Sequence, residues 1–157
     1  MDLLFYSEIF RNLSVAKKNG KPAPHKAILL LSVIDLVASS DIEDERILYS
    51  DSLRKQFVIN WDIHVESCSP FQCIMSTPFY HMSSECFWDL VPIKYGMEPP
   101  KSTPSESLIK RYYKCARINE DLFELLKTKE SRDCLREVLI TKYLRAESKH
   151  SCDSPQL

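Results

Sequence analysis

The chain has 157 residues, 44% of them hydrophobic, and its 21 basic and 22 acidic residues give a net charge of −1. This length suits one domain with a real hydrophobic core, and the apolar content excludes a disordered chain. A net charge near zero excludes a protein that is basic over its whole surface. No apolar run approaches the roughly 20 residues that span a bilayer, and the first ten residues lack the features of a signal peptide. We therefore expect a cytoplasmic protein with no membrane partner.

The first part of the chain predicts two helices. Apolar side chains recur on one face of residues 3–18, and Asn19-Gly20 would end that helix. A second helix is expected over residues 24–39, where apolar residues occupy nearly every position. A helix that is apolar all round belongs in the core of a protein.

The middle of the chain changes from helical to extended patterns. Residues 46–50 suit a short strand, and Ser50 is placed to cap the helix that follows. Residues 78–82 and 86–90 are expected to form two further strands. Residues 92–104 contain four prolines and predict a surface loop.

The last part of the chain again predicts helices. Thr103-Pro104-Ser105-Glu106 has the pattern of a capping box, with Thr103 as the cap of a helix that carries Leu108, Tyr112 and Cys115 on its inner face. Asn119 would cap a short helix, and a final helix is expected over residues 130–146. The fold class is therefore α+β, a helix-dominated single domain over residues 1–147 with a small antiparallel hairpin or sheet. Residues 148–157 should be a disordered tail.

The start of the second helix has an unusual charge. Pro24 suits a first turn because its missing N–H would be unpaired there. His25 and Lys26 then place positive charge where the helix dipole disfavours it. An external anion such as a phosphate would explain this placement, because free backbone N–H groups and Lys26 would both favour it. The alternative is that Lys26 merely points into water.

Basic residues are concentrated in two segments that contain no acid. Residues 11–26 carry five of them and residues 107–117 carry four. A nearly neutral protein with segregated charge can present one basic face to a polyanion. The alternative is ordinary solvated charge that never converges on one face.

No catalytic template is present in the sequence. The motifs of serine hydrolases, phosphate-binding loops, dinucleotide-binding folds and zinc proteases are all absent. His64, Cys68 and Cys73 could be imagined as three metal ligands, but no C-x2-C pair supports zinc. Reduced thiols are the simpler interpretation. We therefore expect no catalytic residue, no cofactor and no bound metal, and a hydrolase that uses Cys68 and His64 is the weakest alternative.

Several motifs, taken in order, resemble one known family. They are the Lys21–Leu31 segment with its Pro-His-Lys core, the pair Phe57 and Trp61, and the segments 78–82, 87–90 and 116–123. The family is the domain found ahead of HNH nuclease domains in bacterial restriction endonucleases. It includes the sulfur-binding domain of phosphorothioation-dependent restriction endonucleases. The resemblance extends over about residues 3–145.

The resemblance implies a domain that binds double-stranded DNA and detects a phosphorothioate in its backbone. Sulfur is larger, softer and less strongly hydrated than oxygen, so a small apolar pocket favours it while basic groups hold the phosphate. By position, Pro78 matches the pocket proline of the family, and Thr77 and His81 flank it. These two residues make the expected pocket more polar than in the members that have an aromatic and a small residue there. The expected DNA-binding residues are Arg11, Lys21, His25, Lys26, Tyr80 and His81.

The resulting hypothesis is a reader module of a modification-dependent restriction system in bacterial defence. No HNH segment follows Leu144, so the cutting activity would come from a separate nuclease domain or subunit. The alternative is a helical protein-interaction module that does not bind DNA and whose basic faces dock an acidic partner.

Overall fold

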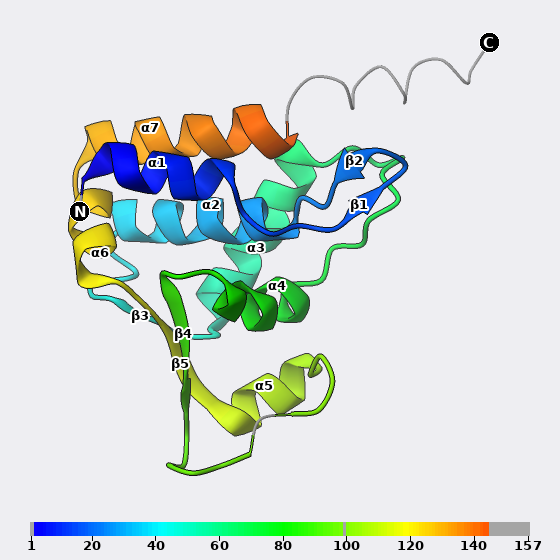
Figure 1. Ribbon diagram of the computed structural model, residues 1–157, viewed down its shortest axis with the longest axis vertical. Coiled ribbons are helices and arrows are strands. Elements are labelled where there is room, and N and C mark those ends of the chain that lie inside the picture. The colour runs from blue at the N-terminus through cyan, green and yellow to red at the C-terminus, as the bar shows by residue number, and fades with distance from the viewer. Residues whose placement is uncertain (1, 99, 145–157) are drawn as a thin grey trace.

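A computed structural model describes residues 2–98 and 100–144, and its elements follow one another as shown in Figure 1. The tail expected at residues 148–157 lies outside the described residues. The helices are α1 (Leu3–Arg11), α2 (His25–Ala38), α3 (Asp51–His64), α4 (Ser76–His81), the 3-10 turn η1 (Met82–Ser84), α5 (Glu106–Tyr112), α6 (Glu120–Leu126), α7 (Lys129–Leu139) and the π-helical turn η2 (Ile140–Leu144). The strands are β1 (Lys17–Lys18), β2 (Lys21–Pro22), β3 (Arg46–Ile47), β4 (Trp88–Pro92) and β5 (Tyr113–Ile118).

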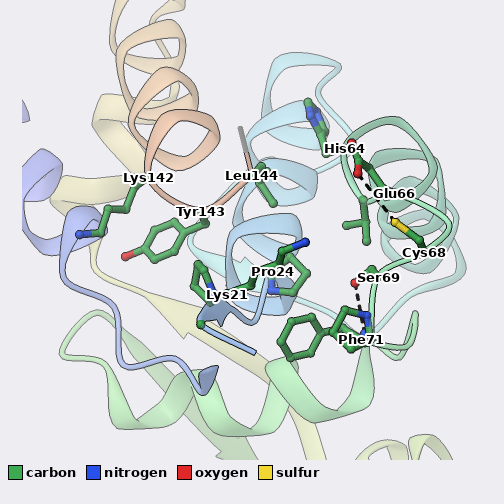
Figure 2. Close-up of a pocket in the computed structure, with 14 residues that line it drawn as sticks. Lys21, Pro24, His64, Glu66, Cys68, Ser69, Phe71, Lys142, Tyr143 and Leu144 are labelled. Carbon is green, nitrogen blue, oxygen red and sulfur yellow. Dashed lines mark hydrogen bonds between the residues drawn. The ribbon is translucent and has the colours of Figure 1, made fainter. Parts of the chain in front are cut away.

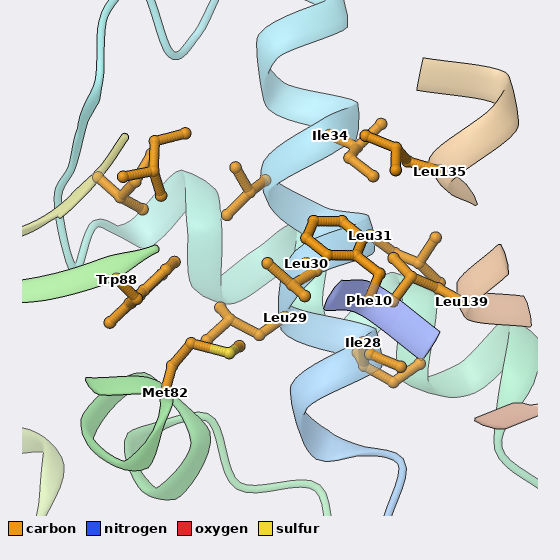
Figure 3. Close-up of a cluster of buried hydrophobic side chains, with 14 of the residues drawn as sticks. Phe10, Ile28, Leu29, Leu30, Leu31, Ile34, Met82, Trp88, Leu135 and Leu139 are labelled. Atoms are coloured by element: carbon orange, nitrogen blue, oxygen red, sulfur yellow. The ribbon is translucent and has the colours of Figure 1, made fainter. Parts of the chain in front are cut away.

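Helix α2 is the centre of the hydrophobic core, as its apolar sequence predicts. Most of its side chains are buried, and α3, α4 and α7 all contact it. Figure 3 shows Phe10 of α1 and Leu139 of α7 beside this helix, and Met82 and Trp88 also packed around it. Burial on every side fixes the position of α2, so its N-terminal turn is held on a rigid support.

The two small sheets lie at opposite sides of this helical body. Strands β1 and β2 form an antiparallel hairpin, and β5 pairs antiparallel with both β3 and β4. In Figure 1, β4 and β5 extend away from the helices and carry α5 at their far end. The expected class, a helix-dominated α+β domain with small antiparallel sheets, is confirmed.

The prediction of a helix over residues 3–18 is wrong beyond Arg11. The chain turns away because Leu13 is buried and its N–H donates to the hydroxyl of Tyr143, 3.0 Å away. Asn19 and Gly20 then adopt positive φ angles of 56° and 78°, which is the geometry of a two-residue hairpin turn. The Asn-Gly pair therefore makes a hairpin and does not end a helix.

The strand expected at residues 78–82 is wrong, because these residues form α4 and the start of η1. Pro78 lies in the first turn of α4, where a missing N–H costs nothing. Phe79 and Met82, three residues apart, are both fully buried, whereas His81 faces solvent. The Phe79 carbonyl also accepts a hydrogen bond from the indole N–H of Trp88 at 3.0 Å, which ties α4 to β4.

The helix expected to include Cys115 ends at Tyr112, and β5 begins at Tyr113. Pairing with β3 on one edge and β4 on the other gives these residues backbone partners as a strand and buries Cys115, Ala116 and Ile118. The cap of α5 is Ser105 and not Thr103, because the Ser105 side chain accepts the Leu108 N–H. The Glu106 carboxylate accepts from the Tyr49 hydroxyl.

The remaining helical predictions hold in their main parts. Helices α2 and α3 lie where they were expected, and the Ser50 side chain caps α3 by accepting from the Leu53 N–H. The strand expected at residues 46–50 is shorter and ends at Ile47.

No helix among the described residues is long and apolar enough to cross a membrane.

Candidate nucleic-acid interface

The first turn of α2 carries the Pro-His-Lys motif and has neither a side-chain cap nor an acidic residue. His25 is held by its surroundings: its Nε2 lies 2.6 Å from the carbonyl oxygen of Gln72. The imidazole also packs against the rings of Trp61 and Phe71, with centroids 4.9 and 5.9 Å away. Burial lowers the pKa of His25, so the ring is neutral at pH 7 and its Nε2–H donates to Gln72.

Lys26 differs from both interpretations that its sequence position allowed. Its side chain is buried, and its Nζ lies 2.7 Å from Glu85 Oε2 and 3.3 Å from Ser84 Oγ. The same Glu85 oxygen accepts the backbone N–H of Ser14 at 2.9 Å. Lys26 therefore points neither into water nor toward an external phosphate, because an internal carboxylate neutralises its charge.

Helix α4 lies beside the first turn of α2, because the segment that contains it is anchored there at both ends. Gln72 contacts His25 before α4, and Glu85 contacts Lys26 after it. This arrangement brings the predicted pocket residues near the Pro-His-Lys motif. The sequence alone could not show it, because about 50 residues separate the two motifs.

The four predicted residues of α4 differ in exposure. Pro78 is buried, and Thr77 and Tyr80 are half-buried. His81 is exposed, and its Nε2 lies 2.7 Å from Thr103 Oγ1, which links α4 to the loop before α5. Of the three predicted pocket residues, His81 is therefore the most exposed and Pro78 the most buried.

Beside the first turn of α2, the β1–β2 hairpin presents lysines, and we call it the lysine hairpin (residues 17–22). Lys17 and Lys18 are exposed, and the Lys18 ammonium lies 5.9 Å from the centroid of the Phe71 ring. Because Phe71 also contacts His25, this cation–π contact joins the hairpin to the motif. Arg11 lies at the exposed end of α1 and pairs with Glu8 at 2.9 Å.

A cavity of about 280 Å³ opens between the lysine hairpin, the start of α2, the loop that follows α3, and η2. Figure 2 shows Lys21 and Pro24 on one side of it, Phe71 and His64 on another, and Lys142 of η2 on a third. Lys21 is half-buried and lines this hollow. Among the described residues, no group of three or more histidine, cysteine, aspartate or glutamate side chains could hold a metal ion.

The second basic segment lies on a different part of the molecule. Lys110 and Arg111 are on α5, whereas Lys114 and Arg117 are on β5, and all four are exposed. Because α4 contacts both α2 and α5, it lies between the two basic regions. A polyanion that follows α4 would therefore meet positive charge on both of its sides.

Two solved structures are similar to this chain over most of its length. The sulfur binding domain of ScoMcrA, solved in complex with phosphorothioated DNA, gives a TM-score of 0.67 at 15% identity over 96% of this chain and 90% of that one. The sulfur binding domain of SprMcrA, also complexed with phosphorothioated DNA, gives a TM-score of 0.63 at 16% identity over 91% of this chain and 86% of that one. The chain has the fold of sulfur-binding domains. No protein-family profile and no curated protein sequence matches the chain.

The resemblance inferred from the motifs is therefore confirmed at the level of the sulfur-binding-domain fold. Two features of the interface were missed by sequence reasoning. Lys17 and Lys18 belong to a hairpin, which the Asn19-Gly20 pair could have indicated. Glu85 had no such signal, because its contact with Lys26 is a tertiary one.

Proposed function

We propose that the chain binds double-stranded DNA and senses a phosphorothioate in its backbone, as the reader module of a modification-dependent restriction system. One observation carries this proposal. The first turn of α2 and helix α4 meet beside the lysine hairpin, within a fold shared with two domains solved in complex with phosphorothioated DNA. The chain would act in the cytoplasm and would not cut DNA itself. A nuclease domain or subunit would supply cleavage.

In this mechanism, the exposed cations position the DNA and α4 reads the modification. Lys17, Lys18 and Arg11 would contact phosphates, which supply affinity without sequence information. The sulfur would lie against Pro78 and the methyl group of Thr77, and His81 would contact the non-sulfur oxygens of the same phosphate. Tyr80, half-buried beside His81, would contact the adjacent sugar.

Three of the predicted DNA-binding residues act differently in this proposal from the way the sequence suggested. Lys26 and His25 are positioning residues, because their contacts with Glu85 and Gln72 hold the two ends of the segment that contains α4. Lys21 faces the cavity of Figure 2 and would contact DNA only at its edge.

The test is direct measurement of binding to matched duplexes of one sequence, with and without a single phosphorothioate, across a series of salt concentrations. We expect the modified duplex to bind more tightly at every salt concentration, and binding to both duplexes to weaken steeply as salt rises. Equal affinity for the two duplexes would remove the sensing role and leave a general DNA-binding domain. No binding to either duplex would favour the alternative, an interaction module for an acidic protein.

A further inference from the structure

A groove lined by tyrosines lies next to α4, on the side that faces the β4–β5 arm. Its volume is about 320 Å³, at the lower end of the range of ~300–1,000 Å³ that ligand pockets occupy. Its walls are formed by Tyr80, Leu90, Pro92, Met97, Tyr112 and Tyr113. We call it the tyrosine groove.

The three tyrosine rings form a continuous aromatic wall. The Tyr113 ring centroid is 6.4 Å from that of Tyr80 and 6.3 Å from that of Tyr112, with the ring planes tilted by 44° and 46°. The three rings therefore give one side of the groove an aromatic lining. All three side chains are half-buried, so they are held in place without being covered.

The remaining walls and edges of the groove suit a nucleobase more than an aliphatic ligand. Leu90, Pro92 and Met97 add apolar surface to the lining, and the Glu98 carboxylate can accept the N–H groups of a base edge. Arg111 and Lys114 are exposed, so α5 and β5, which carry Tyr112 and Tyr113, also bear positive charge at the surface. A base on its backbone offers a flat aromatic ring next to a negative phosphate, which complements both features.

We propose that the tyrosine groove accepts a single unpaired nucleobase of the bound DNA, stacked against the tyrosine wall. This inference rests on the proposed DNA-binding function and deepens it. Tyr80 precedes His81, and their rings lie 5.2 Å apart, so the groove begins beside the residue that would contact the phosphate in the proposed function. The accepted base is therefore one close to the phosphate that is read.

The experiment compares two duplexes of the same sequence, both with the phosphorothioate: one fully paired, the other with one unpaired 2-aminopurine beside the modified phosphate. Binding is followed by competition, and the fluorescence of the 2-aminopurine reports its environment. The wild-type protein should bind the unpaired duplex roughly tenfold more tightly, within the range that base–aromatic stacking gives, and should quench the probe. Tyr112→Leu, which removes a ring at the groove, should lose this preference. Tyr112→Phe should keep it.

Tyr95→Leu is the matched control, because Tyr95 is fully exposed and does not line the groove. This variant should behave as the wild type does. Equal affinity for the two duplexes in the wild type, or equal effects of Tyr112→Leu and Tyr95→Leu, would overturn the groove assignment while the paired duplex still reports DNA binding. Failure to bind either duplex would instead overturn both the proposed function and this inference.

Discussion

The buried ion pair between Lys26 and Glu85 gives the sharpest prediction about stability. Both side chains are about 9% exposed and their charged atoms lie 2.7 Å apart. Glu85→Gln leaves the Lys26 ammonium buried without an opposite charge, although the new amide oxygen can still accept the Ser14 N–H. Breaking one partner of a buried pair costs about 3–5 kcal/mol, because the remaining charge stays uncompensated. We expect the free energy of unfolding to fall by about 3 kcal/mol, at the lower end of that range.

The double variant tests the same reasoning from the other side. Lys26→Met combined with Glu85→Gln removes both charges and keeps the hydrogen-bond acceptor for Ser14. Replacing a buried ion pair by groups of similar volume is often nearly neutral. We therefore expect the double variant to be more stable than either single variant.

The assay is unfolding by urea at neutral pH, followed by the fluorescence of the two buried tryptophans, Trp61 and Trp88. The matched control is Glu124→Gln, which breaks the exposed pair of Glu124 with Lys127, whose side chains are 67% and 51% exposed. That change should cost about 0–1 kcal/mol. If Glu85→Gln costs no more than this control, or if the two single effects simply add in the double variant, Lys26 is not the buried cation described above.

Three further predictions concern DNA binding and pH. The double change Lys17→Gln and Lys18→Gln should weaken binding to any duplex, and the slope of log K against log salt concentration should become shallower by about 0.9 for each phosphate contact that is lost. Lys129 is an exposed lysine on α7, and the control Lys129→Gln should change neither quantity. Equal effects of the two changes would show that the lysine hairpin does not bind DNA. Pro78→Ala should weaken binding to phosphorothioated DNA several-fold, on the order of 1 kcal/mol, and leave the affinity for the plain duplex unchanged. If the affinities for both duplexes fall equally, Pro78 has a structural role and does not contact the modification. Because burial lowers the His25 pKa below its ordinary 6.5, the unfolded chain binds this proton more readily, so stability should be full above pH 6.5 and fall below it. Unfolding midpoints at about pH 7.5 and about pH 5.5 should differ less for His25→Gln than for the wild type, and an unchanged difference would contradict this assignment.

The sequence alone determined those local features, such as a buried helix or a helix cap, that depend on residues close together in the chain. Apolar residues at nearly every position of 25–38 could only form a buried helix, and Ser50 could cap α3 through an N–H three residues away. The order of short motifs was enough to indicate the sulfur-binding-domain fold, which the two solved domains confirm. The sequence pattern wrongly predicted a strand from Pro78, because a proline is tolerated both at the start of a strand and in the first turn of a helix, where the structure has it.

Only the tertiary structure decided where the site residues meet and which charges are free. Lys26 looked like a cation for an external anion, and the contact that neutralises it comes from Glu85, 59 positions along the chain. Residues 113–118 became a strand because β3 and β4 offered it hydrogen-bond partners on both edges. Charge pairing and strand pairing both depend on distances in space between segments that are remote in the sequence. The spacing of residues along the chain does not give those distances, because folding sets them.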